Sequence, residues 1–353
     1  MWRSDFQYYA AIESVDGGRI GDVRLDVDFI PALRWAEFEQ GVMNDSIPEN
    51  CPAHPVIEPV WSSRSSRPYI GGIRIRRNEE RDDTVGFPLA YFSSAVIEAS
   101  SQLVTSGALV AGQRFDYKVF ALADAQDRHP PSSGVAVAAV EAPPAIDRVK
   151  MAPLMAAVEA HSGNVAAPSS ASSLPLTTVM PIFIPQQAFD EATELAQGAS
   201  DVETGGILVG NLCRDSNGTL FSIVTAQIPA EHTTATRQSL RFTPETWVKV
   251  DAAIRLRGLG EIPLGWWHSH PFFCSNCSPE QRALCPFSSP AFSAADRDLH
   301  REVFQKSWSI ALLLSFLGDE RPSYDLFAWN HGQIEAVKYF TLPARSGNPG
   351  EKS

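Results

Sequence analysis

A tract dominated by alanine, proline, serine and valine runs from Gly134 to Thr178 and divides this chain of 353 residues in two. Its part from Ala166 to Ser173 offers too little large apolar surface to order itself, whereas the sequence allows a short helix around Ile146 to Val158. The length allows two domains. We therefore expect an N-terminal domain over residues 1–141, a linker over 142–177, a C-terminal domain over 178–340 and a flexible tail over 341–353.

The N-terminal domain shows the two-residue periodicity of half-buried strands. Apolar residues alternate with polar or charged ones from Val23 to Phe29 and again from Phe115 to Ala121. Between these segments, Ser93 to Val104 favours a helix. The pattern predicts a separate α+β domain with no catalytic cluster. Its arrangement alone suggests that it recruits or positions another molecule.

Charge and hydropathy argue against two classes of partner. The chain carries a net charge of -12, and its short basic run, Arg74 to Arg77, lies beside the acidic residues of Glu79 to Asp83. These features argue against a nucleic-acid groove. Residues Met1 to Phe6 lack the apolar core of a signal peptide, and the longest apolar run, Trp308 to Leu317, is too short to span a bilayer. We expect a cytoplasmic protein without membrane or nucleic-acid partners.

The segment Trp267-His268-Ser269-His270-Pro271 carries the strongest chemical signal. The alternating pattern here predicts a strand, and side chains two residues apart leave a strand from the same face. Both imidazoles would then point to one place, which is the geometry of metal ligands. The alternative is a pair of hydrogen-bonded histidines at a strand end.

A candidate acidic ligand follows in the segment from Ser293 to Asp296. Ser-x-x-Asp ahead of an apolar pattern predicts a capping box that opens a helix, with Ser293 as the N-cap and Asp296 in the first turn. A carboxylate held there is rigid enough to ligate a metal, and the hydroxyl is placed to donate to a developing oxyanion. Asp298 competes as the ligand, but Ala295 occupies the position three residues before it, so the paired hydroxyl is lacking.

Glu203 lies at a predicted junction between a helix and a strand. The helix is expected over Phe189 to Ala196 and is stopped by Gly198, and an apolar run covers Ile207 to Val209. Beside a metal, a carboxylate at such a junction can take a proton from water and pass it to a leaving amine. Without the histidine and aspartate motifs, Glu203 alone would not indicate a function.

Taken together, the glutamate, the His-Ser-His-Pro strand and the Ser-x-x-Asp helix start resemble the JAMM (JAB/MPN/Mov34) metalloprotease family, which includes zinc-dependent deubiquitinases and their prokaryotic relatives. The resemblance covers the expected C-terminal domain. It implies zinc on His268, His270 and Asp296, with Glu203 as general acid/base and Ser293 as oxyanion stabiliser. It also implies an α/β fold of MPN type, a mixed sheet with flanking helices, and cleavage of an isopeptide or peptide bond at the C-terminal tail of a ubiquitin-like protein.

The rest of the C-terminal domain agrees with such a fold. Thr243 to Gly258 has the N-cap, early proline and terminal glycine of a helix. Strands are expected over Ser309 to Phe316, Tyr324 to Trp329 and Ile334 to Tyr339. These elements predict a mixed sheet with helices packed on it.

The chain departs from the family pattern between His270 and Ser293, which 22 residues separate, many more than is usual. This insert carries three closely spaced cysteines: Cys274, Cys277 and Cys285. One interpretation is a second, structural zinc site, with a fourth ligand from His300, Cys213 or His232. The other is three free thiols in a loop rich in proline and serine. Clustered cysteines in a chain of this size suit a reducing compartment better than a disulfide framework.

Other chemistries fit the sequence less well. It has no H-E-x-x-H helix, Walker loop or G-x-S-x-G elbow, and the order of its histidine and cysteine motifs is wrong for a zinc deaminase. Two rivals to the protease hypothesis stay open. One is a non-catalytic MPN scaffold that binds a partner, and the other is an amidohydrolase that acts on short peptides.

Overall fold

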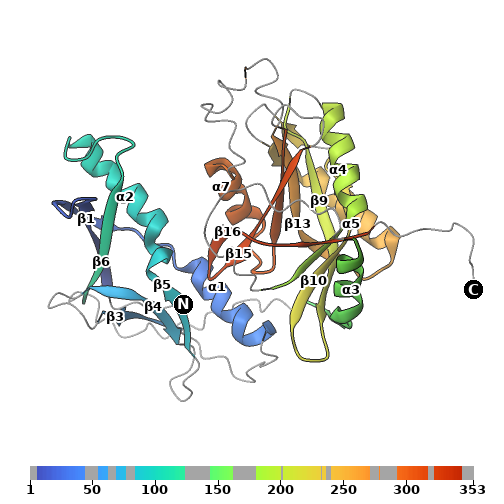
Figure 1. The fold of residues 1–353 in the computed structure, drawn as a ribbon, viewed down its shortest axis with the longest axis horizontal. Coiled ribbons are helices and arrows are strands. Elements are labelled where there is room, and N and C mark those ends of the chain that lie inside the picture. The colour runs from blue at the N-terminus through green and yellow to red at the C-terminus, as the bar shows by residue number, and fades with distance from the viewer. Residues whose placement is uncertain are drawn as a thin grey trace, which may run out of the picture. The chain divides into compact units, whose positions relative to one another are not determined.

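The computed structural model of the chain is a mixed α/β protein with several sheets (Figure 1). It describes residues 6–43, 55–62, 69–76, 84–123, 144–161, 180–199, 202–231, 233–235, 240–270, 278, 292–316 and 322–343. The chain forms two compact units, which are treated separately below. The first comprises residues 1–142 with 331–333, and the second comprises residues 143–330 with 334–353.

Within its described residues, the first unit contains two three-stranded antiparallel sheets and two α-helices. One sheet has the order β2-β1-β6 and the other the order β3-β4-β5. Their bounds are β1 Phe6–Ser14, β2 Arg19–Leu25, β3 Val56–Trp61, β4 Ile70–Arg76, β5 Thr84–Pro88 and β6 Phe115–Ala123. The helices are α1 (Ile30–Glu37) and α2 (Ser93–Thr105), with a π-helical turn over Phe38–Met43 and a 3-10 turn over Leu89–Phe92.

The sequence predictions for this unit hold except at one strand end. The helix expected from Ser93 and the strand expected from Phe115 are both present. The strand expected to reach Phe29 ends at Leu25 instead, and Phe29 becomes the N-cap of α1, which has a proline in its first turn. Phe29 is buried and stacks on Tyr91 with 6.3 Å between ring centroids, so it serves the core from a loop. The alternation of apolar and polar residues therefore extends beyond the end of β2, because Phe29 packs into the core from the following loop.

The second unit is built on a mixed sheet of nine strands, with the order β16-β15-β14-β13-β9-β10-β8-β17 and β7 paired with β9. The strands are β7 Ile146–Arg148, β8 Ile182–Pro185, β9 Gly205–Arg214, β10 Leu220–Pro229, β13 Ile262–His270, β14 Ile310–Ser315, β15 Ser323–Asn330, β16 Gln333–Ala336 and β17 Phe340–Leu342. A separate small hairpin pairs β11 (Thr233–Ala235) with β12 (Leu240–Phe242). The helices are α3 Met151–His161, α4 Gln186–Ala199, α5 Pro244–Arg257 and α7 Ala294–Val303.

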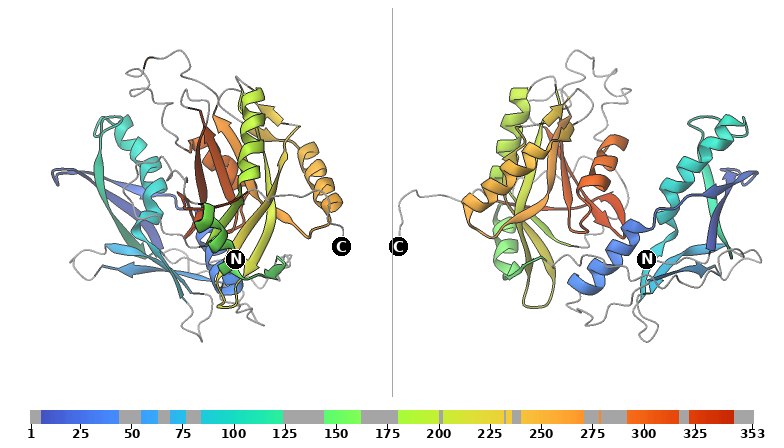
Figure 2. Two further views of the ribbon diagram at one scale, coloured as in Figure 1. Left: turned by 45° about the vertical axis from the view of Figure 1, so that its right-hand side comes forward. Right: turned by 180° about the vertical axis from the view of Figure 1, so that it is seen from behind.

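Helices α4 and α7 cover opposite faces of this sheet at β13. On one face, Trp267 donates from its indole N–H to Gln227, whose amide donates to Glu191 of α4. Neighbouring side chains of a strand point to opposite faces, and the adjacent His268 contacts Asp296 of α7. Figure 1 and the rear view in Figure 2 both show α4 (yellow-green) and α7 (orange) on either side of the sheet. The predicted helices and strands of this unit are present, and Gly258 ends α5 in the left-handed conformation that favours glycine. Two predicted ends are wrong: α4 continues through Gly198 to Ala199, and the strand expected over Ile334 to Tyr339 ends at Ala336.

The first half of the segment expected as a linker over residues 142–177 is ordered, and it contains a helix close to the short one that the sequence allows around Ile146 to Val158. Strand β7 pairs in parallel with β9, and α3 packs its apolar side chains on the sheet. Val158 of α3 is buried against Phe183, Cys213 and Phe221. The apolar residues of α3 look sparse among alanines in the sequence. They are nevertheless buried or partly buried, because they pack on the sheet, and local composition does not indicate this packing. Residues 162–177 and the tail from 344 lie outside the described residues.

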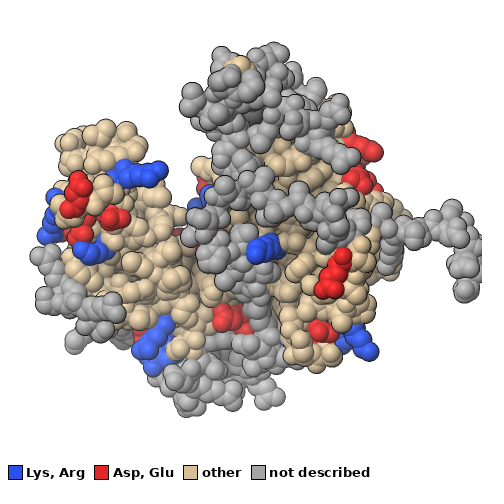
Figure 3. Space-filling view, viewed as in Figure 1, with Lys and Arg blue, Asp and Glu red and all other residues tan. Residues whose placement is uncertain are grey.

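Charged side chains are scattered over the described part of the face drawn in Figure 3, with uncharged surface between them. Among the described residues, no helix combines the length and the apolar character needed to cross a membrane.

Candidate metal centre

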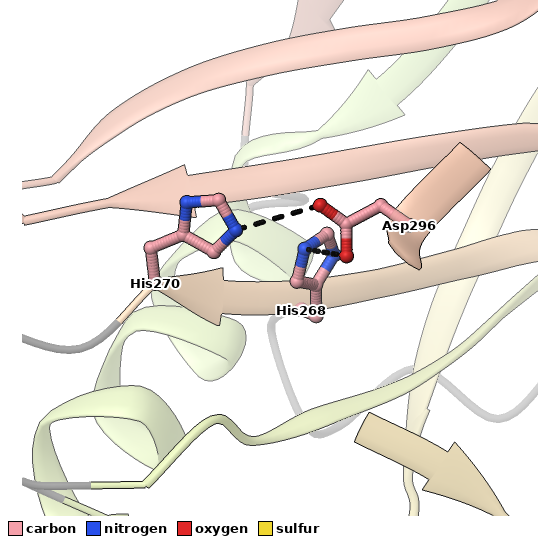
Figure 4. A group of neighbouring side chains, drawn as sticks. All are labelled: His268, His270 and Asp296. Carbon is pink, nitrogen blue, oxygen red and sulfur yellow. Dashed lines mark ion pairs between the residues drawn. The ribbon is translucent and has the colours of Figure 1, made fainter. Parts of the chain in front are cut away.

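The two histidines of the His-Ser-His-Pro segment lie at the end of β13, in the middle of the nine-stranded sheet. This strand pairs in parallel with β14 and antiparallel with β9, so neighbouring backbone holds it on both sides. His268 is fully buried, whereas the side chain of His270 is 19% exposed. Their ring centroids are 5.1 Å apart, and Figure 4 shows both rings on the same side of the strand. The alternation of the sequence predicts this placement correctly.

Asp296 reaches the same place from the first turn of α7. The predicted capping box is confirmed, because the N–H of Ser293 donates to Asp296 Oδ2 at 2.8 Å and the N–H of Asp296 donates to Ser293 Oγ at 3.1 Å. Asp296 Oδ1 lies 3.1 Å from Nε2 of His268, and Oδ2 lies 3.6 Å from Nε2 of His270 (Figure 4). The cap thus fixes a carboxylate between two imidazoles.

These three side chains suit a metal ion. One ligand atom from each of them lies within 4.8 Å of the others. Among the described residues, the one close polar contact of buried His268 is its ion-pair contact with Asp296, 3.1 Å from Nε2, and its Nδ1 has no hydrogen-bond partner. Buried polar atoms are normally satisfied, so the free lone pair is what a metal ligand would present. Two imidazoles and one carboxylate suit zinc, and imidazole also binds copper, iron and nickel.

The surroundings keep the Asp296 carboxylate ionised. Burial alone would raise its pKa, but His268, His270 and the side chain of Ser293 outweigh that effect and lower the pKa below its ordinary range. Burial also lowers the pKa of His268, which favours the neutral ring. A neutral imidazole and an ionised carboxylate are the forms that bind metals.

Glu203 lies just before β9 and next to this group. It is 4% exposed, and its Oε2 has no hydrogen-bond partner among the described residues. Burial raises its pKa to about 7; His270 lowers the value and Asp296 raises it, so both act on this carboxyl group electrostatically. The structure therefore brings His268, His270 and Asp296 together and places Glu203 near enough to interact electrostatically with His270 and Asp296. Ser293, the fifth predicted residue, adjoins them as the cap of α7.

Ser269, between the two histidines of β13, forms hydrogen bonds with the residue that follows Glu203. Its backbone N–H donates to the carbonyl oxygen of Thr204 at 2.9 Å, and its Oγ accepts from the N–H of Thr204 at 3.3 Å. Thr204 directly follows Glu203, so the backbone of the glutamate is fixed beside β13. No local sequence signal predicts this contact of Ser269, because it joins segments 65 residues apart.

Two glycines allow β9 to approach β13 this closely. Gly205 pairs with His268, and a Cβ added at Gly205 would lie 2.4 Å from the carbonyl oxygen of Trp267. A Cβ added at Gly206 would lie 2.5 Å from the indole nitrogen of Trp267. Contacts this short require backbone or a packed ring to move. The Gly-Gly pair therefore helps to set the distance between Glu203 and the histidines.

Cys274, Cys277 and Cys285 lie outside the described residues, as does His232, so the second zinc site stays a prediction. Cys213, one candidate for its fourth ligand, lies in the apolar cluster beneath α3, where burial raises the pKa of its thiol to about 11. His300 is buried and already accepts a hydrogen bond from Trp266.

Comparison with known proteins does not assign this chain to a family. No family model and no curated protein matches it. Among solved structures, it is similar to the solution structure of protein DSY2949 from Desulfitobacterium hafniense, with 19% sequence identity and a TM-score of 0.30 over 48% of this chain and 99% of that one. A likeness this weak identifies neither fold nor function. The functional conclusion therefore depends on the geometry of the metal centre.

Proposed function

We propose that the second unit is a zinc-dependent hydrolase of the JAMM type, with an MPN-type fold, that cleaves an isopeptide or peptide bond at the C-terminal tail of a ubiquitin-like protein. The observation that carries this proposal is the convergence of His268, His270 and Asp296 within 4.8 Å, with the buried carboxyl group of Glu203 beside them. Three protein ligands leave a fourth position of a tetrahedral ion open, as in hydrolytic zinc sites.

His268, His270 and Asp296 would hold the ion. When bound, zinc lowers the pKa of a coordinated water to about 7 and polarises the carbonyl group of the scissile bond. The rigidity of the three ligands comes from the chain itself: two leave one strand, and the third is held by the capping box of α7. This geometry is set before any substrate binds.

Glu203 is the proton carrier. Its carboxylate takes a proton from the attacking water as the new carbon–oxygen bond forms, and it delivers that proton to the amine as the carbon–nitrogen bond breaks. A pKa of about 7 places both protonation states within reach near neutral pH. The buried Oε2 of Glu203 has no hydrogen-bond partner among the described residues that would compete for the proton.

Ser293 stabilises the oxyanion of the tetrahedral intermediate. Its backbone N–H is occupied by Asp296 Oδ2, and its Oγ accepts from the N–H of Asp296. A hydroxyl that accepts one hydrogen bond still has a hydrogen to donate. The hydroxyl is therefore the group of Ser293 that can serve the developing negative charge.

The substrate class rests on the resemblance to JAMM proteases. The first unit would recruit or position the conjugate, since it forms its own sheets and helices. The cytoplasm keeps thiols reduced, which suits the cysteines of the insert. If those cysteines bind a second zinc, that ion would be structural.

The test is cleavage of a panel of ubiquitin-like proteins with C-terminal extensions, alongside short peptides, with the Glu203→Gln variant as the control. Cleavage of the extended proteins by the wild type alone supports the proposal. Cleavage of the peptides alone overturns the substrate class and favours a small-peptide amidohydrolase. No cleavage of either group by zinc-loaded wild type overturns the enzymatic proposal and favours a scaffold.

A further inference from the structure

A stack of aromatic rings lies directly behind the ligand His268. The Trp266 indole stacks on the His268 ring, with centroids 4.5 Å apart and an angle of 15° between the planes. Phe304 also stacks with Trp266, with centroids 5.8 Å apart and an angle of 12°. All three rings are buried. The orientation of the His268 ring is therefore coupled to that of the indole.

This stack takes the place of the usual support of a metal-binding histidine. Such a ring normally donates its second N–H to a carboxylate, a carbonyl or a water, which fixes its orientation. His268 has no hydrogen-bond partner on Nδ1 or Nε2 among the described residues. Apart from the Asp296 carboxylate, which lies 3.1 Å from Nε2, the stack on Trp266 is the contact that holds the plane of the His268 ring. A rotation of Trp266 would remove that contact.

His300 fixes the rotation of Trp266. The indole N–H of Trp266 donates to Nδ1 of His300 at 3.1 Å, and both side chains are completely buried. A flipped indole would leave its N–H unpaired in the core, which is strongly unfavourable. His300 therefore selects the orientation in which the flat face of Trp266 meets His268.

One helix supplies both this support and a metal ligand. Asp296 and His300 lie four residues apart on α7, on the same side of the helix. Asp296 contacts Nε2 of His268 directly, whereas His300 acts on the His268 ring indirectly, through Trp266. The capping box that places Asp296 thus also sets the position of His300 along β13.

We propose that His300 is a positioning residue of the metal centre: it holds Trp266 against His268 and so keeps His268 in its ligating orientation. This inference rests on the proposed metal site. It requires no contact between His300 and the ion, and it assigns a function to a buried histidine that lies outside the motif.

Three variants separate this role from general stability. His300→Leu removes the acceptor at similar size, and His300→Asn restores an acceptor oxygen near the position of Nδ1. Trp329→Phe is the matched control. Trp329 packs on His300, with 5.4 Å between ring centroids, and its indole N–H donates to the carbonyl oxygen of Phe304. This variant therefore loses a buried hydrogen bond from the same cluster but leaves the side chain of Trp266 unchanged. The measurements are the zinc dissociation constant by chelator competition, the unfolding midpoint and the NMR signal of the Trp266 indole N–H.

We expect His300→Leu to weaken zinc binding by roughly 10- to 100-fold, the usual effect of losing such outer support. The indole signal should shift at the same time. His300→Asn should stay within a factor of about 3 of the wild type, and Trp329→Phe should lower the unfolding midpoint but keep zinc affinity. If His300→Leu binds zinc as tightly as the wild type, the inference is overturned while the metal site stands. If the wild type itself binds no zinc, the proposed metal site fails and the inference falls with it.

A double-variant cycle covers the case in which His300→Leu does not fold. Trp266→Phe keeps an aromatic ring beside His268 and removes the N–H that needs an acceptor. In that background, Trp266→Phe/His300→Leu should bind zinc as tightly as Trp266→Phe alone, because His300 then has nothing to orient. An equal, additive loss of affinity in both backgrounds would show that His300 does not act through Trp266.

Discussion

Two acidic side chains of the proposed metal centre differ in their surroundings, and this difference supports separate proposed roles for them. Asp296 accepts from the N–H of Ser293 and faces two imidazoles, which hold its pKa below the ordinary range. Glu203 is buried, and its Oε2 has no hydrogen-bond partner among the described residues, which raises its pKa to about 7. Environments that separate the pKa values of neighbouring acids are typical of sites with one charge-bearing group and one proton carrier.

Replacement of Glu203 by glutamine tests that assignment. Glu203→Gln should retain its zinc, because Glu203 is not one of the three converging ligands. It should lose roughly 10² to 10⁴ in turnover, as is typical when a positioned acid/base is removed. Metal analysis and steady-state kinetics on the same preparation provide the measurement. Wild-type turnover in the variant would show that Glu203 carries no proton.

The raised pKa of Glu203 also predicts how the stability of the metal-free protein depends on pH. Between pH 4.5 and about 7, the folded protein binds the proton of Glu203 more tightly than the unfolded chain does. Wild type should therefore lose stability relative to Glu203→Gln as pH rises through this window, by at most about 3 kcal/mol. Denaturant unfolding at several pH values measures the difference, in which other titrating groups largely cancel. A constant difference would contradict the assigned pKa.

At the scale of elements, the site is the meeting point of β9, β13 and α7. Strand β13 supplies two ligands, α7 supplies the third, and the turn before β9 supplies the glutamate. Two glycines of β9 allow the close approach to β13. The proposed site therefore depends on the packing of β9, β13 and α7. Within these elements, strand alternation orients the two histidines and the capping box orients Asp296.

The cap of α7 should contribute to both stability and turnover. Ser293→Ala removes the side-chain acceptor for the N–H of Asp296, which typically costs about 1 kcal/mol of unfolding free energy. Loss of the oxyanion donor should lower turnover by roughly 10² to 10³. Ser293→Thr, which retains the hydroxyl, is the control and should stay close to the wild type in both measurements. If Ser293→Ala keeps wild-type turnover, the hydroxyl has no catalytic role.

Local patterns in the sequence predict much of this site. Alternation identifies β13, and the Ser-x-x-Asp pattern identifies the start of α7, because both depend on neighbours within a few residues. The pairing of Ser269 with Thr204 and the bond from Trp266 to His300 join distant segments, so no periodicity reveals them. For the same reason, the sequence allows a short helix near α3 but predicts neither β7 nor the packing of α3 on the sheet: the surface that buries Val158 is formed by residues beyond Met180.

At the scale of the whole molecule, the second unit begins earlier than its motifs suggest. Strand β7 pairs with β9, which leads directly from Glu203, and α3 covers Cys213 and Phe221 on the same sheet. The functional unit therefore includes residues that composition assigns to a linker. The structural boundary between the units lies near residue 143.

Two fragments test that boundary. A fragment of residues 144–343 should fold and bind zinc, whereas a fragment of residues 178–343 should unfold at a lower temperature, because it loses the pairing of β7 and exposes the cluster beneath α3. Thermal unfolding and zinc content of both fragments provide the measurement. Equal melting temperatures would show that β7 and α3 add nothing to the unit. The longer fragment should also discriminate less among conjugates than the full chain, if the first unit selects substrate.

The central claim, a metal centre on His268, His270 and Asp296, is tested most directly by elemental analysis of the purified wild type and the His268→Ala/His270→Ala variant. The account predicts zinc in the wild type and at least one equivalent fewer in the variant, because a single carboxylate cannot hold the ion alone. Any zinc on the cysteines of the insert would remain in both proteins. Equal metal content in the two proteins, or no zinc in the wild type, would contradict the account.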